Sequence, residues 1–376
     1  MGRSIHVPIT PSVLQWAIEE SGLSTDVLAE RVDVDETELE AWLRGQAQPS
    51  LTAFKKLAVA LRRPTATFLL PRPPNTKPVG IEFRHPPGVA SRDLLPEERL
   101  RIREVTRLQD AVAWLLDEMG DTTPELPRLS SSVTSEAAGM RLRDILNVDI
   151  ATQTGWPDAS TALKEWRRAL ETAGVLVFLL PMGADAARGF SIWNPRAPAV
   201  VANTHWNPAA RVFTLLHEFA HVLTRTNSVC AEDGRSQGSA TNIERWCEQV
   251  AAATLMPETS VRAFMRREGA VNLGTTSRVA AHFLVSLRAA TLRLIGLGLA
   301  KWSLYNSLPA ASDAKRGGGG GSGRNRVQVR IDEYGRRTTS TFVRAVQRDV
   351  IAIADAMRYL DVSDQNLIDL EKSLAA

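Results

Sequence analysis

One short motif constrains this chain more than any other feature. The run HEFAH begins at His217 and ends at His221, so it has the form His-Glu-x-x-His. Asn207 can cap a helix just upstream and Pro208 suits its first turn. Residues four apart lie on one helix face, so both imidazoles can bind one metal ion, and Glu218 would lie where it can take a proton from a bound water. The chain holds only 6 histidines, so this spacing favours a metal site over two structural histidines.

A zinc site of this kind needs a third protein ligand and one open position. The predicted helix over residues 243–255 carries two acids, Glu244 and Glu248, four apart on one face. Cys247 is a soft ligand nearby, but it lies off that face by about a third of a turn. The residues alone leave Glu244 and Glu248 as equal alternatives, and at least one of them would be a solvated helix charge. The expected cofactor is Zn²⁺.

The charges are distributed in blocks along the chain. Nine acids and two bases lie between Glu19 and Arg44, and twelve bases and five acids between Lys55 and Arg107. Nine bases and three acids lie in residues 315–349. The net charge of the whole chain is only +3, which does not by itself indicate nucleic-acid binding. The blocks indicate separate units with different surfaces.

Two breaks in composition divide the chain. Four prolines fall in residues 71–78, which predicts an extended linker or a rigid turn, and five consecutive glycines follow Arg316. The predicted organisation is an N-terminal domain of short helices, a proline-rich linker, a metal-binding domain, a Gly-rich linker and a basic helical C-terminal region. Their predicted ranges are 1–70, 71–96, 97–308, 309–325 and 326–376.

The periodicity predicts an α+β fold that is predominantly helical. Four short helices are expected: one over residues 11–21, one that begins at residue 24, one that begins at residue 35 and one over residues 51–61. A long amphipathic helix is expected over residues 97–119. Runs bounded by Gly, Pro and Asn predict short strands over 175–180, 189–193 and 199–202. The motif helix, over 209–223, follows these strands. A small sheet is therefore expected beside the metal helix.

Several classes of protein are disfavoured. The chain has only two cysteines, Cys230 and Cys247, so neither a disulfide framework nor a four-cysteine zinc site is expected. The start of the chain lacks an apolar signal region. Arg293 interrupts the longest apolar stretch of the C-terminal third, which falls short of the ~20 residues of a membrane helix. We expect a cytoplasmic protein without a membrane partner.

The N-terminal segment has the spacing of a helix-turn-helix. Leu28, Val34, Leu39 and Trp42 would form its core, and the small Ala29 would let two helices cross closely. A packing helix follows over 51–61.

With these motifs in place, the chain resembles two known families. The N-terminal unit resembles the phage-repressor (Cro-type, XRE) helix-turn-helix domain, and the rest resembles the ImmA/IrrE family of zinc metallopeptidases. Besides the His-Glu-x-x-His motif, the stretches that carry the resemblance are Phe68–Pro71, Glu82–Arg84, Arg188–Trp193, Ala197–Pro198, Glu244–Cys247, Met256–Pro257 and Ser286–Arg288.

The resemblance implies a fold and an activity. The second domain would have a gluzincin-like metallopeptidase fold with a small sheet, in which His217, His221 and Glu244 bind Zn²⁺ and Glu218 is the catalytic base. The metal-binding glutamate of the family lies at the start of the second helix, which corresponds to Glu244. The position of Glu248 is commonly Asn in the family, so the resemblance favours Glu244. Because this chain has a carboxylate there instead, Glu248 is kept as the alternative ligand.

The resemblance also implies a regulatory role. We expect a DNA-binding transcriptional regulator with a zinc-dependent endopeptidase domain, of the antitoxin type or of the stress or phage repressor type. One alternative is a peptidase that cleaves a repressor or partner protein and uses its helix-turn-helix for protein docking. Another is a catalytically silent, antitoxin-like binding protein. The expected partners are operator DNA, a protein substrate or a cognate toxin or repressor, and a second copy of the chain in a homodimer.

The predicted recognition helix is acidic, which opposes DNA binding. Phosphate contacts need cations or helix N-terminal donors, and this helix has no base before Arg44. The candidate DNA contacts are Thr37, Glu38, Arg44, Lys55 and Lys56.

Overall fold

The computed structural model describes residues 5–74, 94–226, 228–230, 242–308 and 325–375. The stretch Glu82–Arg84, the glycine run and most of the two predicted linkers lie outside these residues. The fold is α+β and predominantly helical, as predicted, with a helix-turn-helix unit, a peptidase-like unit and a helical C-terminal region.

Contacts divide the described chain into two compact units, and the division falls inside α5 (Pro96–Glu118). The first unit holds residues 5–74 and 94–103, and the second holds the remaining described residues.

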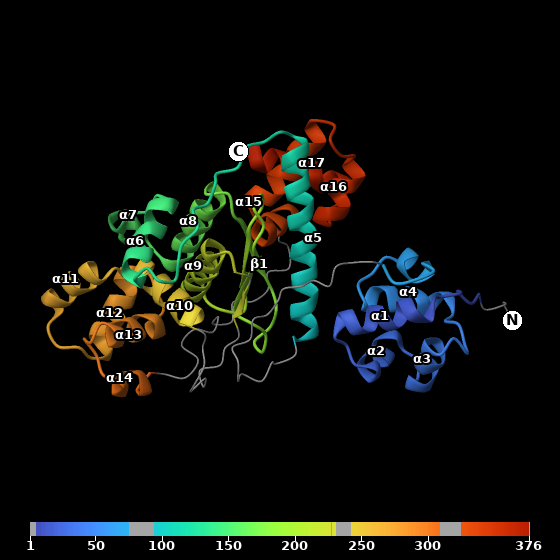
Figure 1. Cartoon of the computed structure of the whole chain (residues 1–376), viewed down its shortest axis with the longest axis horizontal. Coiled ribbons are helices and arrows are strands. Elements are labelled where there is room, and N and C mark those ends of the chain that lie inside the picture. Colours follow the sequence, from blue (N-terminus) through green and yellow to red (C-terminus); the bar gives the residue numbers. More distant parts are fainter. Residues whose placement is uncertain (1–4, 75–93, 227, 231–241, 309–324, 376) are drawn as a thin grey trace. The chain divides into compact units, whose positions relative to one another are not determined.

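The first unit is a bundle of short helices (Figure 1). Apolar residues at helical spacing, among them Leu14, Leu28, Leu39, Trp42 and Leu57, are fully buried and form its core. Its elements are α1 (Pro11–Ser21), α2 (Thr25–Val32), α3 (Glu36–Leu43), α4 (Leu51–Ala60) and the 3-10 helix η1 (Thr65–Leu69).

The second unit is built on a four-stranded sheet with the order β1-β3-β2-β4. β1 (Leu176–Leu180) runs parallel to β3 (Ala199–Asn203). β2 (Gly189–Ile192) is antiparallel to both β3 and β4 (Ser228–Cys230). The fourth strand was not predicted, because three residues carry no recognisable period.

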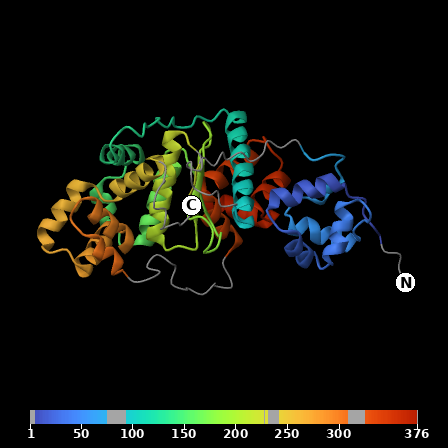
Figure 2. The ribbon, with the colours of Figure 1, turned by 60° about the horizontal axis from the view of Figure 1, so that its bottom comes forward.

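Helices cover both faces of this sheet (Figures 1 and 2). α8 (Ala159–Thr172) and α9 (Pro208–Thr224) pack on one face, where Val177 and Val200 join their core. On the other face, the ring of Phe178 meets that of Tyr334 from α15 at a centroid distance of 6.2 Å. α5 reaches the sheet through Gln109, whose buried amide donates to two backbone carbonyl groups around the β2–β3 turn at 2.8 Å.

The C-terminal helices pack on the edge strand β1. Along α15 (Arg326–Gln347), the side chain of Tyr334 donates to Glu104 of α5 at 2.7 Å. Arg167 of α8 donates to the carbonyl oxygen of Val177 in β1 at 2.8 Å and to that of Asp332 in α15 at 2.7 Å. The outer edge of the sheet is thereby covered, which protects it from pairing with another chain.

The second unit contains further helices, some between α5 and α8 and the others after α9. They are α6 (Ser135–Leu146), α7 (Ile150–Gly155), α10 (Asn242–Leu255), α11 (Glu258–Glu268), α12 (Leu273–Phe283), α13 (Leu287–Gly296), α14 (Trp302–Asn306), α16 (Ile353–Leu360) and α17 (Asp364–Ala375). Among the described residues, no single helix has the length and hydropathy of a membrane span; α12 and α13 meet that test only as a pair, and they are bent by 106°.

Candidate metal centre

Helix α9 carries the His-Glu-x-x-His motif. The side chain of Asn207 accepts a hydrogen bond from the backbone N–H of Ala210 at 2.9 Å, and Pro208 occupies the first turn, as the sequence predicts. Every residue from Thr214 to Thr224 is buried. The helix is therefore held on all sides, and His217 and His221 are one turn apart on a rigid element.

Helix α10 supplies the acid. Glu244 lies in its first turn, and the helix packs against both α9 and α6. α6 approaches closely because Gly139 has no side chain: a Cβ there would lie 2.8 Å from the backbone nitrogen of Thr254 and 2.9 Å from Ala253.

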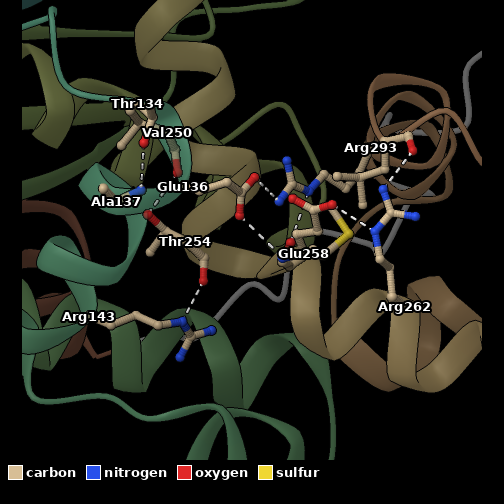
Figure 3. Close-up of polar contacts among 11 residues, drawn as sticks. Thr134, Glu136, Ala137, Arg143, Val250, Thr254, Glu258, Arg262 and Arg293 are labelled. Atoms are coloured by element: carbon tan, nitrogen blue, oxygen red, sulfur yellow. Dashed lines mark hydrogen bonds and ion pairs between the residues drawn. The ribbon is translucent and has the colours of Figure 1, made fainter.

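Arginine side chains fix the far end of α10 (Figure 3). Arg143 of α6 is buried and donates from Nε to the carbonyl oxygen of Thr254 at 2.6 Å, as Figure 3 shows. Burial lowers the pKa of Arg143 to about 10, which still leaves it charged near neutral pH. Arg293 of α13 donates to the carbonyl oxygen of Met256 at 2.9 Å and pairs with Glu136 of α6 at 2.5 Å. These contacts hold the helix that positions Glu244.

Three ligand atoms meet between the two helices. The Nε2 atoms of His217 and His221 are 3.2 Å apart. Oε2 of Glu244 lies 3.4 Å from Nε2 of His217 and 3.3 Å from Nε2 of His221. Within the described residues, these three side chains form the one group of His, Cys, Asp or Glu residues whose ligand atoms could hold a metal ion.

This triangle fits a zinc ion. Three ligands placed about 2.1 Å from a tetrahedral zinc ion lie about 3.4 Å from one another, which matches the three separations. Both histidines are buried, whereas the side chain of Glu244 is 35% exposed. One side of the group is therefore accessible to solvent, as a catalytic site with an open position requires.

Interactions among the ligands shift the pKa values of His217 and Glu244. Burial lowers the pKa of His217, but the hydrogen bond with Glu244 and the charges of Glu218 and Glu244 raise it more, so the net shift is upward. Burial raises the pKa of Glu244, but its hydrogen bonds with the two histidines lower it further, to well below its usual range. A ligand imidazole must be neutral, so a metal ion binding here competes with a proton.

Two family models match this chain. Residues 170–294 match the IrrE N-terminal-like domain. This match, to the model of a peptidase family, covers strands β1 to β3 and the helices α9 and α10. Residues 14–68 match the helix-turn-helix model, in the order that the sequence predicts. The comparison with curated proteins gave no match.

Inside the IrrE-like domain, Glu218 is buried on α9 directly over β2. Gly189 makes this approach possible, because a Cβ on it would collide with the carbonyl oxygen of Val201 and the side chain of Thr214 and would lie 3.5 Å from Cγ of Glu218. This role of Gly189 was not predicted from the sequence. A glycine inside a strand is the signal that could have found it, since it often marks a close approach.

The other two candidate ligands lie outside the group of three. Glu248 is exposed one turn further along α10 and acts on His217 only through its charge. Cys247 is fully buried, and burial raises the pKa of its thiol well above the usual value, so it stays protonated. Of the alternatives that the sequence left open, the structure brings Glu244 to the histidines.

The helix-turn-helix match suggests DNA binding. Of the candidate contacts, Thr37 and Glu38 are exposed on α3, and Lys55 is exposed on α4. Arg44 forms an ion pair with Glu40, which lies one turn before it.

The last candidate contact, Lys56, also has an acidic partner. Its Nζ lies 3.1 Å from Oδ2 of Asp33. Two of the three candidate cations are therefore paired with acids on the same unit, although both pairs are exposed to solvent.

Proposed function

We propose that this chain is a regulator that combines a zinc-dependent endopeptidase with a DNA-binding domain. The observation that carries the proposal is the triangle of ligand atoms from His217, His221 and Glu244 beside the buried carboxylate of Glu218. When bound, zinc makes a coordinated water more acidic and polarises a carbonyl group. The match to an IrrE-like peptidase domain supports this reading.

In this proposal, the residues of the chain hold and move protons. Glu218 accepts the proton of the attacking water and later gives it to the leaving amine nitrogen of the cut peptide bond. Its burial strengthens its electrostatic interactions, because charges act more strongly where water is excluded. His217 and His221 stay fixed on one helix, so the acceptor and the ligands keep their relative position during the reaction.

The regulatory part of the proposal rests on the helix-turn-helix match. We propose that this unit binds operator DNA, and that the peptidase domain acts on a repressor or is coupled to a cognate toxin, in the cytoplasm. Such a chain would be a stress or phage regulator or an antitoxin.

The peptidase proposal predicts that Glu218→Gln stops proteolysis and leaves metal binding in place. Glutamine is close in size to glutamate but cannot take the proton, and loss of a general base costs roughly 10²- to 10⁴-fold in rate. The measurement is profiling of new protein N-termini in a host-cell lysate after incubation with wild type or Glu218→Gln, with elemental analysis of both proteins. New N-termini that appear equally with both proteins contradict the proposal.

The acidic face of α3 favours a second candidate function, in which the helix-turn-helix unit docks a protein. Glu36 and Glu38 in its first turn and Asp35 just before it are exposed, and they oppose a phosphate backbone. This face suits docking of a protein better than docking of DNA.

A salt titration separates the two functions. If the unit binds the DNA upstream of its own gene, affinity falls with salt, and Lys55→Ala reduces the slope of log K against log salt by about 1. Lys301→Ala, which removes an exposed lysine from the second unit, serves as the control. Absent or salt-independent binding contradicts the DNA-binding proposal and leaves protein docking.

A further inference from the structure

His221 is held from both sides of its ring. Its Nε2 atom faces His217 and Glu244, while its Nδ1 atom lies 3.1 Å from the hydroxyl oxygen of Thr226. Neither Thr226 nor Thr224 was predicted from the sequence to be part of the site.

The end of α9 brings the hydroxyl of Thr226 beside Nδ1 of the His221 ring. Arg225 has a left-handed backbone conformation with φ of 64°, which ends the helix. The backbone N–H of Thr226 then donates to the carbonyl oxygen of His221 at 3.1 Å. This hydrogen bond folds the chain back toward the last turn of α9. The side chain of Thr226, five residues after His221, therefore lies next to Nδ1.

The directions of the hydrogen bonds around Thr226 are determined by one backbone carbonyl group. The hydroxyl of Thr224 lies 2.9 Å from the carbonyl oxygen of His221, which can only accept, so Thr224 donates its single proton there. Thr224 can then only accept from Thr226, whose hydroxyl lies 2.9 Å away. The hydroxyl of Thr226 also has the carbonyl oxygen of His221 as a second acceptor, at 3.3 Å. With its proton used in either bond, Thr226 can only accept from His221, so Nδ1 of His221 carries a proton.

We propose that Thr226 is a positioning residue that selects the tautomer of His221 protonated on Nδ1. This tautomer leaves the lone pair of Nε2 directed at the metal centre, and the hydrogen bond fixes the orientation of the ring. The inference rests on the proposed metal centre, and it adds Thr226 to the residues on which metal affinity depends.

The first test is metal affinity. Thr226→Val removes the acceptor with little change of shape, and we expect it to weaken zinc binding roughly 10- to 100-fold, as measured by competition with a chelator. Thr226→Ser keeps the hydroxyl and should bind zinc nearly as wild type does. Thr122→Val changes an exposed threonine elsewhere in the unit and is the matched control. Equal affinity of Thr226→Val and wild type overturns the inference alone.

The second test needs no metal. Nitrogen NMR of the imidazole groups distinguishes the two tautomers in metal-free protein above neutral pH. The Glu244→Ala background is used, because the carboxylate of Glu244 would otherwise accept a proton from Nε2 of His221 at 3.3 Å. The His221 signal is identified by its loss in His221→Gln. In this background we expect the Nδ1-protonated form with Thr226 or Thr226→Ser and a mixture with Thr226→Val. The same tautomer in all three variants overturns the inference. A wild type that binds no zinc while this tautomer pattern holds contradicts the proposed metal centre instead.

Discussion

Glu244→Ala is expected to lose the zinc ion, whereas Glu248→Ala keeps it. The carboxylate of Glu244 lies 3.3 and 3.4 Å from the two imidazole nitrogens, so its removal leaves two ligands where a zinc site of this type needs three. We expect a loss of affinity larger than the roughly 10- to 100-fold that follows loss of an outer partner. Glu248 acts on the centre only through its charge, so its removal should have a much smaller effect.

Elemental analysis of the purified proteins measures this directly. Wild type and Glu248→Ala should each contain about one zinc ion per chain, and Glu244→Ala should contain almost none. Glu248→Ala is a matched control, because it removes the same side chain from the same helix one turn away. A wild type that takes up no zinc after loading would contradict the proposed peptidase.

Gly335→Ala is expected to destabilise the second unit strongly, although it adds only one methyl group. Gly335 lies inside α15 with φ of 85° and ψ of 157°, a conformation essentially restricted to glycine. A Cβ there would collide with the carboxylate of Glu171, lie 2.9 Å from the carbonyl oxygen of Val177 and lie 3.2 Å from Nη2 of Arg167. Backbone strain and overpacking together should lower the free energy of unfolding by roughly 2 to 5 kcal/mol.

The collision matters because its partners cannot move away cheaply. Arg167 and Glu171 form an ion pair at 3.3 Å in which both side chains are about nine-tenths buried, and Val177 belongs to the sheet. Separating the pair would leave a buried charge without its partner, which is strongly destabilising.

Chemical denaturation of wild type and variant, followed by tryptophan fluorescence, measures the loss. Gly120→Ala is the control, because Gly120 also has a positive φ, of 65°, but open space where the Cβ would lie. That variant should cost about 1 kcal/mol, from backbone strain alone. Equal effects of the two substitutions would contradict the packing of α15 on the sheet.

The elements that sequence predicted well are those whose signal is local. The capped helix with His217 and His221 follows from residues adjacent in sequence, because Asn207 and Pro208 define its start and the periodicity defines its buried side. The three strands β1 to β3 follow from apolar runs bounded by turn residues, and the two family resemblances rest on the same local stretches.

Contacts between distant elements had no such signal. Glu244 and Glu248 share one face of α10, so spacing left them equal, and the preference for Glu244 came from the family resemblance. The packing of α10 against α9 places the first turn of that helix beside the histidines. Thr226 was not predicted, because the metal motif in the sequence indicates the ligands and not the hydrogen-bond partners of those ligands. The hydrogen bond that matters is made by the turn at the end of α9.

The sequence by itself determined the short helices of the first unit, the helices α5, α9 and α10, most of the sheet and the three metal-motif residues of α9, because helix periodicity and capping are encoded within a few turns. The tertiary structure brought Glu244, which the resemblance had favoured, to the two histidines. It also decided the orientation of His221 and the covering of β1 by the C-terminal helices around Gly335. The orientation of His221 depends on the backbone turn that ends α9. The other two depend on which faces of separate elements meet, and that is decided by burial and close packing between elements, which no local pattern records.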